Sequence, residues 1–339
     1  MSYETRWIRV QNGTDRAGAL LDVRGLTTRF ATERGLVHAV EDVSFTVQPG
    51  EAVGLVGESG SGKSTVLRSV LGLVKPPGRV VSGEVLFRGR DLRALPEEEL
   101  WRIRGGQISL IFQDPVNALN PSLTIGDQLR RMLRLHRTTE PAGGFDREIM
   151  RMLARVGIDA TGKLNGYAFN YSQGQLQRIM IAAACLAGTP SLLLADEPTT
   201  SLDVTIEAQV LQLLRDLRQE LGLALILVTH NLALVAELCD RVLVMYAGRV
   251  VEEGDVYSVF EAPKHPYTHQ LLRALPRFPA TGERLEAIAG SVPDLVSLSG
   301  GCAFAPRCER YLGAVCDTQL PPLFETGNPK QRAACHVYA

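Results

Sequence analysis

The sequence contains the stretch Gly57-Glu58-Ser59-Gly60-Ser61-Gly62-Lys63-Ser64, which matches the pattern G-x-x-x-x-G-K-[ST]. The apolar run at residues 52–56 before it predicts a buried strand, and the apolar spacing at residues 63–73 after it predicts a helix. A strand, a glycine-rich loop and a helix in this order are the setting that the pattern requires. A plain glycine-rich turn beside a solvated lysine is the alternative, and this setting argues against it. The stretch therefore predicts an α/β protein built around this loop.

The loop predicts a binding site for a nucleoside triphosphate with Mg²⁺. Glycines let backbone N–H groups close around phosphates, and the start of the following helix favours negative charge. In such a loop Lys63 reaches the β- and γ-phosphate oxygens, and the Ser64 hydroxyl ligates Mg²⁺. We therefore predict a nucleoside triphosphate and Mg²⁺ as ligands of this loop. The predicted binding residues of this segment are Gly57, Glu58, Ser59, Gly60, Ser61, Gly62, Lys63, Ser64 and Thr65.

Two adjacent carboxylates end a second predicted strand. Residues 192–195 are apolar, and Asp196 and Glu197 follow them directly. Open α/β sheets place ligands at the carboxyl ends of their strands. We expect Asp196 to orient Mg²⁺ and Glu197 to polarise the attacking water as a general base. A strand that merely ends in two solvated acids is the alternative, and the upstream loop argues against it.

The composition excludes several classes of protein. Of 339 residues, 45% are hydrophobic and 22% charged, which is typical of a folded globular chain. Lys and Arg number 36 against 37 Asp and Glu, so no overall attraction to nucleic acid or anionic lipid is expected. Residues 1–14 lack an apolar segment of the secretory type, and the longest apolar runs are too short to cross a bilayer. We expect a chain that stays inside the cell and meets a membrane only through a partner.

Alternating apolar patterns predict the remaining elements. Residues 21–50 predict short strands with turns, and residues 124–157 have helical spacing that predicts a helical insertion. After residue 254 repeated prolines predict a small, loop-rich appended unit. Further strands are expected at residues 83–87, 108–112, 223–228 and 241–245, with helices at 206–221 and 231–239.

The order of these motifs resembles the ABC ATPase family over nearly the whole chain. Gln113, in Ile111-Phe112-Gln113-Asp114-Pro115, resembles the family's Q-loop, in which a glutamine touches Mg²⁺ and the attacking water. Asp203, in Ser201-Leu202-Asp203, resembles the D-loop at the dimer interface, and His230 resembles the switch histidine. Phe30 lies where the family stacks an aromatic ring on adenine, although core packing is an equally ordinary use of Phe. The resemblance implies Glu197, His230 and Gln113 as catalytic residues, and Ser64, Gln113 and Asp196 around Mg²⁺.

The stretch Tyr171-Ser172-Gln173-Gly174-Gln175 resembles the family signature, usually Leu-Ser-Gly-Gly-Gln. In the family this helix start meets the γ-phosphate held by the other subunit of a dimer, so Ser172, Gly174 and Gln175 are expected to bind nucleotide there. Gln173 replaces the first glycine, and Tyr171 replaces the usual leucine. An ordinary capped helix start is the alternative when these residues are taken alone. The departure leaves open a slower or structural half-site.

Four of the six cysteines lie in the last forty residues, after a segment, residues 263–276, that resembles peptide-importer ATPases. Spacing alone leaves both metal binding and scattered thiols open. The resemblance implies a [4Fe–4S] cluster, with Zn²⁺ as the alternative, because both accept four thiolates. Cys185 and Cys239 lie in apolar helical runs and are expected to be buried packing thiols. The expected cluster ligands are Cys302, Cys308, Cys316 and Cys335.

The resemblance implies the ATP-hydrolysing subunit of a membrane ABC transporter that imports di- or oligopeptides. The implied partners are a second ABC ATPase subunit, two transmembrane permease subunits and an extracytoplasmic solute-binding protein, with the chain peripheral on the cytoplasmic face of the membrane. Nickel or another small solute is the alternative cargo, and a catalytically impaired half of a heterodimer is the alternative role. A soluble ABC protein acting on DNA or ribosomes would need coiled-coil insertions or a second cassette, which the sequence lacks, so no nucleic-acid partner is expected.

The implied fold is an α/β P-loop NTPase of the ABC ATPase type, with a β-subdomain and a helical insertion. Residues 1–18 are expected to form an N-terminal tail, and residues 19–255 the nucleotide-binding domain, whose helical part spans about 114–187. Residues 256–339 are expected to form a loop-rich C-terminal domain that carries the four-cysteine cluster.

Overall fold

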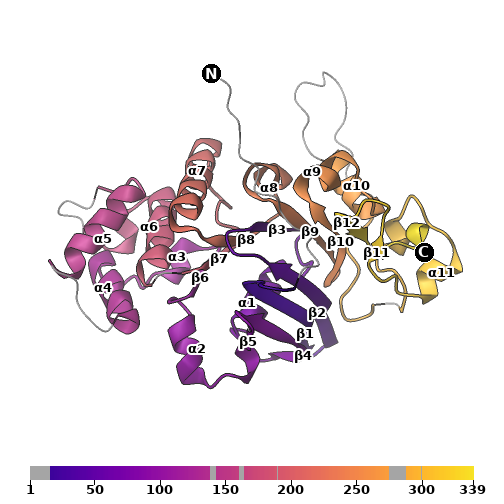
Figure 1. Ribbon diagram of the computed structural model, residues 1–339, viewed down its shortest axis with the longest axis horizontal. Helices are drawn as coiled ribbons and strands as arrows, with labels where there is room; N and C mark the ends of the chain where they lie inside the picture. The colour runs from indigo at the N-terminus through magenta and orange to yellow at the C-terminus, as the bar shows by residue number, and fades with distance from the viewer. Residues whose placement is uncertain (1–15, 138–142, 160–163, 189, 275–287, 299) are drawn as a thin grey trace.

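The computed structural model describes residues 16–137, 143–159, 164–188, 190–274, 288–298 and 300–339. Most of the predicted N-terminal tail, residues 1–15, lies outside this part of the chain. Figure 1 shows a central region of sheets, a helical region at one end and the C-terminal segments at the other. In the described residues no helix is both long enough and apolar enough to cross a membrane.

The centre of the molecule is a parallel sheet in the strand order β9-β3-β8-β7-β6. All residues of β3, β7, β8 and β9 are buried, which explains their continuous apolar sequences. The predicted α/β fold is therefore confirmed. The strands are β3 (Ala52–Val56), β6 (Ile108–Ile111), β7 (Leu192–Asp196), β8 (Ala224–Thr229) and β9 (Arg241–Tyr246).

Apolar side chains cover both faces of this sheet. On one face, α1 (Lys63–Val70) packs with residues of an antiparallel sheet. On the other face, α7 (Val204–Leu221) and α8 (Leu232–Leu238) bury their apolar sides. Both helices begin at a side-chain cap, Asp203 for α7 and Asn231 for α8. These two layers hold the strand ends in fixed positions.

The antiparallel sheet has the order β2-β1-β4-β5. Its first two strands, β1 (Leu21–Thr32) and β2 (Gly35–Val47), form one long hairpin, so the prediction of short strands in this segment was wrong. The reason is that Gly25 and Asp42, both with positive φ, lie at a register shift inside the paired strands rather than in turns. The sheet is completed by β4 (Gly78–Phe87) and β5 (Arg90–Asp91), followed by η1 (Leu92–Ala94) and α2 (Glu97–Ile103).

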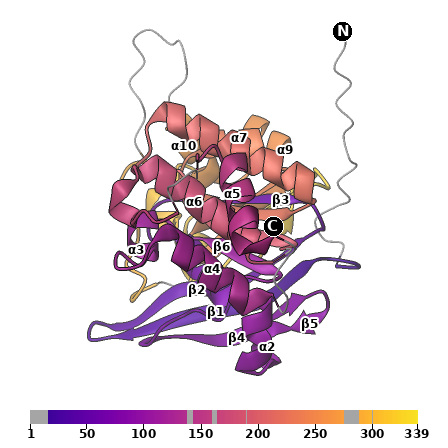
Figure 2. The same cartoon turned by 90° about the vertical axis from the view of Figure 1, so that its left-hand side faces the viewer.

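The helical region between β6 and β7 has an apolar core of its own, formed by side chains such as Leu129, Ile149 and Ile179. Figure 2 shows α4, α5 and α6 side by side. Thr124 caps α4, and Ser172 caps α6. The elements are α3 (Pro115–Ala118), α4 (Ile125–His136), α5 (Gly144–Arg155), η2 (Ala168–Asn170) and α6 (Gln173–Leu186).

The C-terminal segments extend the central sheet. β10 (Arg249–Asp255) pairs antiparallel with β9, and β12 (Gln331–Ala333) pairs with β10. Tyr267 and Phe304 belong to the same buried core as α7 and α8. The remaining elements are α9 (Val256–Glu261), α10 (Pro266–Arg273), η3 (Ala305–Arg307), α11 (Ala314–Thr318), β11 (Phe324–Glu325) and η4 (His336–Tyr338). We call residues 256–339 the C-terminal unit.

Candidate functional site

The phosphate loop, residues 57–64, connects β3 to α1 in a conformation that requires glycine. Gly57 has a φ of 149°, and a Cβ there would lie 2.2 Å from the Met245 carbonyl oxygen. Gly62 has a φ of 101°, and a Cβ there would lie 2.2 Å from the Ala39 carbonyl oxygen. A side chain at either position would collide with backbone. The loop is therefore held against β9 and β2 by contacts that only glycine permits.

Lys63 lies folded against this loop. Its Nζ donates to the carbonyl oxygens of Gly57 and Glu58, each at 2.8 Å, and approaches Ser61 Oγ at 3.3 Å. Burial lowers the pKa of Lys63, and the carboxylates of Glu197, Asp196 and Glu58 oppose this shift. The buried ammonium group is thus satisfied by loop oxygens. Phosphate oxygens of a nucleotide would offer it stronger, charged acceptors at the same place.

Ser64 and Asp196 bring two oxygen ligands together. Ser64 Oγ donates to Asp196 Oδ1 at 2.6 Å, and Arg68 Nη2 lies 4.0 Å from Asp196 Oδ2. Burial raises the pKa of Asp196, while the Ser64 hydrogen bond and nearby Arg68 oppose that shift. A hydroxyl and a carboxylate at the mouth of a phosphate loop are the oxygen donors that Mg²⁺ prefers. These residues therefore fit the predicted cation.

Polar side chains that follow two neighbouring strands contact Glu197, at the end of β7. Gln113 Nε2, after β6, donates to Glu197 Oε2 at 3.1 Å, and His230 Nδ1, after β8, lies 3.4 Å from the same oxygen. Thr200 Oγ1 also donates to it at 2.8 Å. Glu197 has a φ of 47°, an uncommon conformation for a residue with a side chain and one often found at functional sites. The structure thus brings Gln113, Glu197 and His230 together, and it adds Thr200, which the sequence patterns did not single out.

The signature segment, residues 171–175, lies at the start of α6 and is largely exposed. Ser172 Oγ accepts from Gln175 N at 3.3 Å, and Gln175 Oε1 accepts from Ser172 N at 2.9 Å, which makes a capping box. Gln173 is the first helical residue and is exposed. A Cβ on Gly174 would lie 2.8 Å from Ile206 Cγ2, so glycine permits close packing against α7.

Two further predicted site residues lie away from the carboxylates. Asp203 is exposed and caps α7, accepting from Ile206 N at 2.9 Å. Phe30 on β1 is only partly buried, and its ring covers Gly78, where a Cβ would lie 2.4 Å from Phe30 Cε1. The ring therefore packs on the antiparallel sheet while keeping an accessible part. Adenine stacking by Phe30 stays a prediction.

Comparison with known proteins places the chain in a family. Residues 40–200 match the family described as "ABC transporter", and residues 251–316 match "Oligopeptide/dipeptide transporter, C-terminal region". The chain is 46% identical over 321 residues to the oligopeptide transport ATP-binding protein OppD of Escherichia coli K12, which covers 94% of both chains. The chain belongs to the ABC transporter family. It is also 44% identical to the dipeptide transport ATP-binding protein DppD of the same strain, over 94% of this chain and 96% of that protein.

Solved structures agree with this assignment. The dimeric cassette MJ0796, in a post-hydrolysis state bound to ADP and Pi, superposes with a TM-score of 0.62 and 28% identity over 70% of this chain and 98% of that one. The structure of cbiO1 from Clostridium perfringens, part of the ABC transporter complex cbiONQ, gives a TM-score of 0.60 and 28% identity over 72% of this chain and 92% of that one. The predictions of family, cassette fold and enzyme class are confirmed. The protein is an ABC ATPase, for which ATP and Mg²⁺ are the expected ligands.

The four C-terminal cysteines of this ABC ATPase lie within electrostatic reach of one another. The Cys302 N–H donates to the Cys316 carbonyl oxygen at 2.7 Å. Burial raises the pKa of Cys302 to about 11, and Cys308, Cys316 and Cys335 add to that shift. Burial likewise raises the pKa of Cys308 and of Cys335. Among the described residues, however, no three side chains of His, Cys, Asp or Glu have the arrangement of a metal-holding group.

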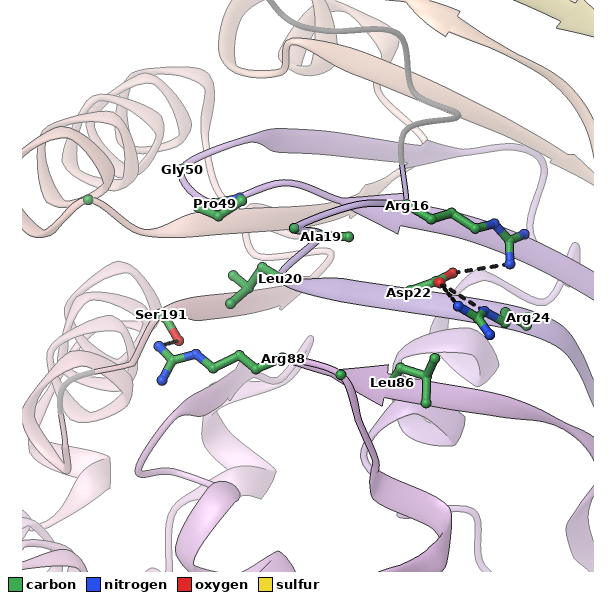
Figure 3. Close-up of a pocket in the computed structure, with 13 residues that line it drawn as sticks. Arg16, Ala19, Leu20, Asp22, Arg24, Pro49, Gly50, Leu86, Arg88 and Ser191 are labelled. Carbon is green, nitrogen blue, oxygen red and sulfur yellow. Dashed lines mark hydrogen bonds and ion pairs between the residues drawn. The ribbon is translucent and has the colours of Figure 1, made fainter.

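A separate hollow of about 550 Å³ lies at the amino ends of β3, β7 and β8, next to Gly50, Ser191 and Gly222 (Figure 3). Its charged side chains form ion pairs with one another or hydrogen bonds to neighbouring residues. Arg24 lies 2.7 Å from Asp22, and Arg88 Nη2 donates to Ser191 Oγ at 2.9 Å. The phosphate loop lies at the opposite, carboxyl ends of the strands, where open α/β sheets bind ligands. This hollow is therefore distinct from the nucleotide site of the ABC ATPase.

Proposed function

We propose that this ABC ATPase powers the import of di- or oligopeptides through a membrane transporter. The observation that carries the proposal is the extent of the similarity. Identity to OppD and DppD runs over 94% of the chain, and residues 251–316, which include the first part of the C-terminal unit, match the oligopeptide/dipeptide transporter region. The peptide assignment is thus supported by similarity outside the ATPase motifs as well as within them.

In the proposed reaction the phosphate loop binds the triphosphate of ATP, and Lys63 exchanges its carbonyl partners for β- and γ-phosphate oxygens. Bound Mg²⁺, held by Ser64 and Asp196 with Gln113 nearby, would neutralise charge on the phosphates. Glu197 accepts a proton from the attacking water. Gln113 and His230, both close to Glu197 Oε2, orient that water and steady the γ-phosphate.

We further propose that a second ATPase subunit completes each site. Ser172, Gln175 and Asp203 are exposed in this chain and lie at the starts of α6 and α7, and a helix start favours negative charge. The similar cassette MJ0796 is dimeric in its ADP- and Pi-bound state. Gln173 is exposed on the first turn of α6, where its side chain has room to point away from a phosphate. This supports an active half-site over the structural half of a heterodimer.

We propose that the permease subunits dock beside Gln113. Phe112 and Val116 flank this residue, with 47% and 52% of their surfaces exposed. Exposed apolar side chains mark a surface for binding another protein, and here that surface lies next to a catalytic residue. Through such partners the chain would sit on the cytoplasmic face of a membrane, next to an importer served by an extracytoplasmic solute-binding protein.

We divide the chain into the tail 1–18, the nucleotide-binding domain 19–255 with its helical part at about 114–187, and the C-terminal domain 256–339. The separate apolar core of α4, α5 and α6 supports the helical part. The end of β10 at Asp255 supports the second boundary.

We also propose that Cys302, Cys308, Cys316 and Cys335 bind a [4Fe–4S] cluster. Burial and the neighbouring thiols of Cys308, Cys316 and Cys335 raise the pKa of Cys302, so a positively charged centre would favour the thiolate forms. Among the described residues these side chains do not, as they stand, form a group that could hold a metal ion, so cluster binding would require them to rearrange. Anaerobic purification with absorbance, iron and sulfide analysis tests this, with Cys185→Ala, a buried thiol of α6, as the control. Colourless protein with stoichiometric zinc would overturn the cluster.

The transport proposal is tested by uptake of labelled di- and oligopeptides into cells that express the complete transporter. Lys63→Ala is expected to abolish uptake, because the buried ammonium would no longer meet the phosphates. The matched control is Lys75→Ala, which removes an exposed lysine after α1. Normal peptide uptake by Lys63→Ala would sink the motor role, and uptake of nickel but not peptide by the wild type would sink the proposed cargo.

A further inference from the structure

Arg307 connects the cysteine-bearing segment to the phosphate loop. It lies in η3, between Cys302 and Cys308, and its side chain is only 5% exposed. Nη1 donates to Glu58 Oε2 at 2.8 Å, and Nη2 donates to Glu58 Oε1 at 3.1 Å. Glu58 is the second residue of the phosphate loop. A partly buried, two-point ion pair thus joins positions 249 residues apart in the sequence.

Hydrogen bonds and two aromatic rings also hold the Arg307 side chain in place. Its Nε donates to the Ala289 carbonyl oxygen at 2.8 Å, and Nη1 also donates to Tyr246 Oη at 3.2 Å. The guanidinium carbon lies 5.8 Å from the centre of the Tyr246 ring and 5.9 Å from that of Phe304. Such a group has little freedom to follow a moving partner, so it fixes Glu58 in place.

A second contact reaches the backbone of the same loop residue. The Glu58 N–H donates to Tyr267 Oη at 2.8 Å. Tyr267 comes from α10, is fully buried and packs against Tyr246 and Phe304, with ring centres 4.7 and 5.4 Å away. The C-terminal unit therefore holds both the amide and the carboxylate of Glu58.

Glu58 in turn supports the groups that would meet phosphate. Its carbonyl oxygen accepts from Lys63 Nζ at 2.8 Å and from Ser61 N at 3.2 Å. A shift of the Glu58 peptide would move this carbonyl and the turn up to Ser61. Phosphate binding depends on loop amides that are already in position, because ordering them during binding costs free energy.

We propose that Arg307 and Tyr267 are positioning residues that hold the phosphate loop in its nucleotide-ready shape, so that the C-terminal unit sets nucleotide affinity. Neither side chain needs to touch the nucleotide. Because coupling between two sites is reciprocal, nucleotide binding also stabilises the segment around Arg307. This inference depends on the ATPase site and holds for any cargo.

The test measures binding of the fluorescent nucleotide mant-ATP with Mg²⁺ to the full-length chain. Arg307→Gln is expected to raise the Kd about tenfold, and Glu58→Gln by a similar factor. The double variant is expected to match either single variant, since both remove one interaction. Arg332→Gln is the matched control, because Arg332 joins β12 to Glu253 of β10 away from the loop. Its Kd is expected to stay within about twofold of the wild type.

Two further measurements separate positioning from a loss of folding. Tyr267→Phe keeps the buried ring and removes only the hydroxyl acceptor, and it is expected to raise the Kd about threefold. Hydrogen exchange at residues 302–316 is expected to slow when Mg·ADP is added to the wild type but not to Arg307→Gln. A Kd within twofold of the wild type for both Arg307→Gln and Tyr267→Phe would overturn the proposal. An Arg332→Gln defect as large as that of Arg307→Gln would overturn it as well.

Discussion

The carboxyl edge of the parallel sheet and the signature segment are two parts of the proposed nucleotide site, and they differ in how far their polar groups are assembled within one chain. At the sheet edge the polar groups already contact one another: Ser64 with Asp196, and Gln113 with Glu197. In the signature segment Ser172 and Gln175 accept from each other's backbone N–H groups, and both residues are exposed. The difference teaches that one chain prepares the binding and hydrolysis groups by itself, whereas the second set of phosphate contacts is left for a partner subunit.

The comparison predicts its largest effect at Glu197. Glu197→Gln keeps the shape of the side chain but removes the base, so ATP turnover of the assembled complex is expected to fall about 10²- to 10⁴-fold. The Kd for mant-ATP is expected to change less than about threefold, because Lys63 and the loop remain. Steady-state phosphate release and fluorescence titration measure the two quantities.

The control for this experiment is Glu84→Gln, which changes an exposed carboxylate on β4. It is expected to turn over ATP at the wild-type rate. Unchanged turnover of Glu197→Gln would remove Glu197 from the catalytic role and would leave the contacts at the sheet edge without the function assigned to them.

Ser172 provides the sharpest test of the comparison itself. Ser172→Ala removes a hydroxyl that would meet the phosphate bound by a second subunit, so turnover of the assembled complex is expected to fall about thirtyfold. In the isolated chain the Kd for mant-ATP is expected to stay the same, unlike that of Lys63→Ala. Ser172→Thr retains the hydroxyl and the helix cap and is the matched control. Weakened binding by isolated Ser172→Ala would break the distinction between the two halves.

The smallest predicted effect concerns the pH dependence of stability, through the buried side chain of His265 in the C-terminal unit. Burial lowers the pKa of His265 to about 3, and its Nδ1 accepts from Tyr267 N as the cap of α10. The unfolded chain binds a proton near the ordinary His pKa of about 6.5 and the folded chain does not, so this residue lowers stability as pH falls below that value. Between pH 7 and pH 6 the loss is about 0.7 kcal/mol.

His265→Asn keeps a capping oxygen but does not titrate. Its free energy of unfolding, measured in urea at both pH values, is expected to lack that loss. Burial raises the pKa of neighbouring Glu252, which accepts from the His265 N–H, and this gives a pH dependence of opposite sign in both proteins. Comparing the two proteins therefore isolates His265. Equal losses in both would show that His265 is not the titrating group.

The sequence predicted those parts of the site whose functional residues lie close together in the chain. The phosphate loop and the Asp196–Glu197 pair each lie within one short segment, and the structure shows them at the ends of β3 and β7. The strand lengths of β1 and β2 were missed because a bulge and a turn use similar residues. β11 and β12 are two and three residues long, too short for any periodic pattern.

Contacts between residues far apart in the sequence could not be predicted from local patterns. Gln113 and His230 were placed near Glu197 only through the order of motifs and the family resemblance. Tyr267 lies 209 residues from Glu58, and nothing near either residue indicates the hydrogen bond between them. Arg307 stands in a proline- and cysteine-containing loop, where an arginine is ordinarily taken for an exposed charge. Only the folded arrangement shows that its side chain is buried.

The pairing of β12 with β10 has a consequence for dissecting this protein. Glu252, Glu253 and Gly254 are registered against Ala333, Arg332 and Gln331. A chain shortened to end at Asp255 would leave β10 as a bare outer strand, with unpaired backbone groups open to other molecules and with Tyr246 stripped of its aromatic neighbours. Such a fragment is expected to self-associate, so the nucleotide-binding domain of this protein is best produced together with the C-terminal unit.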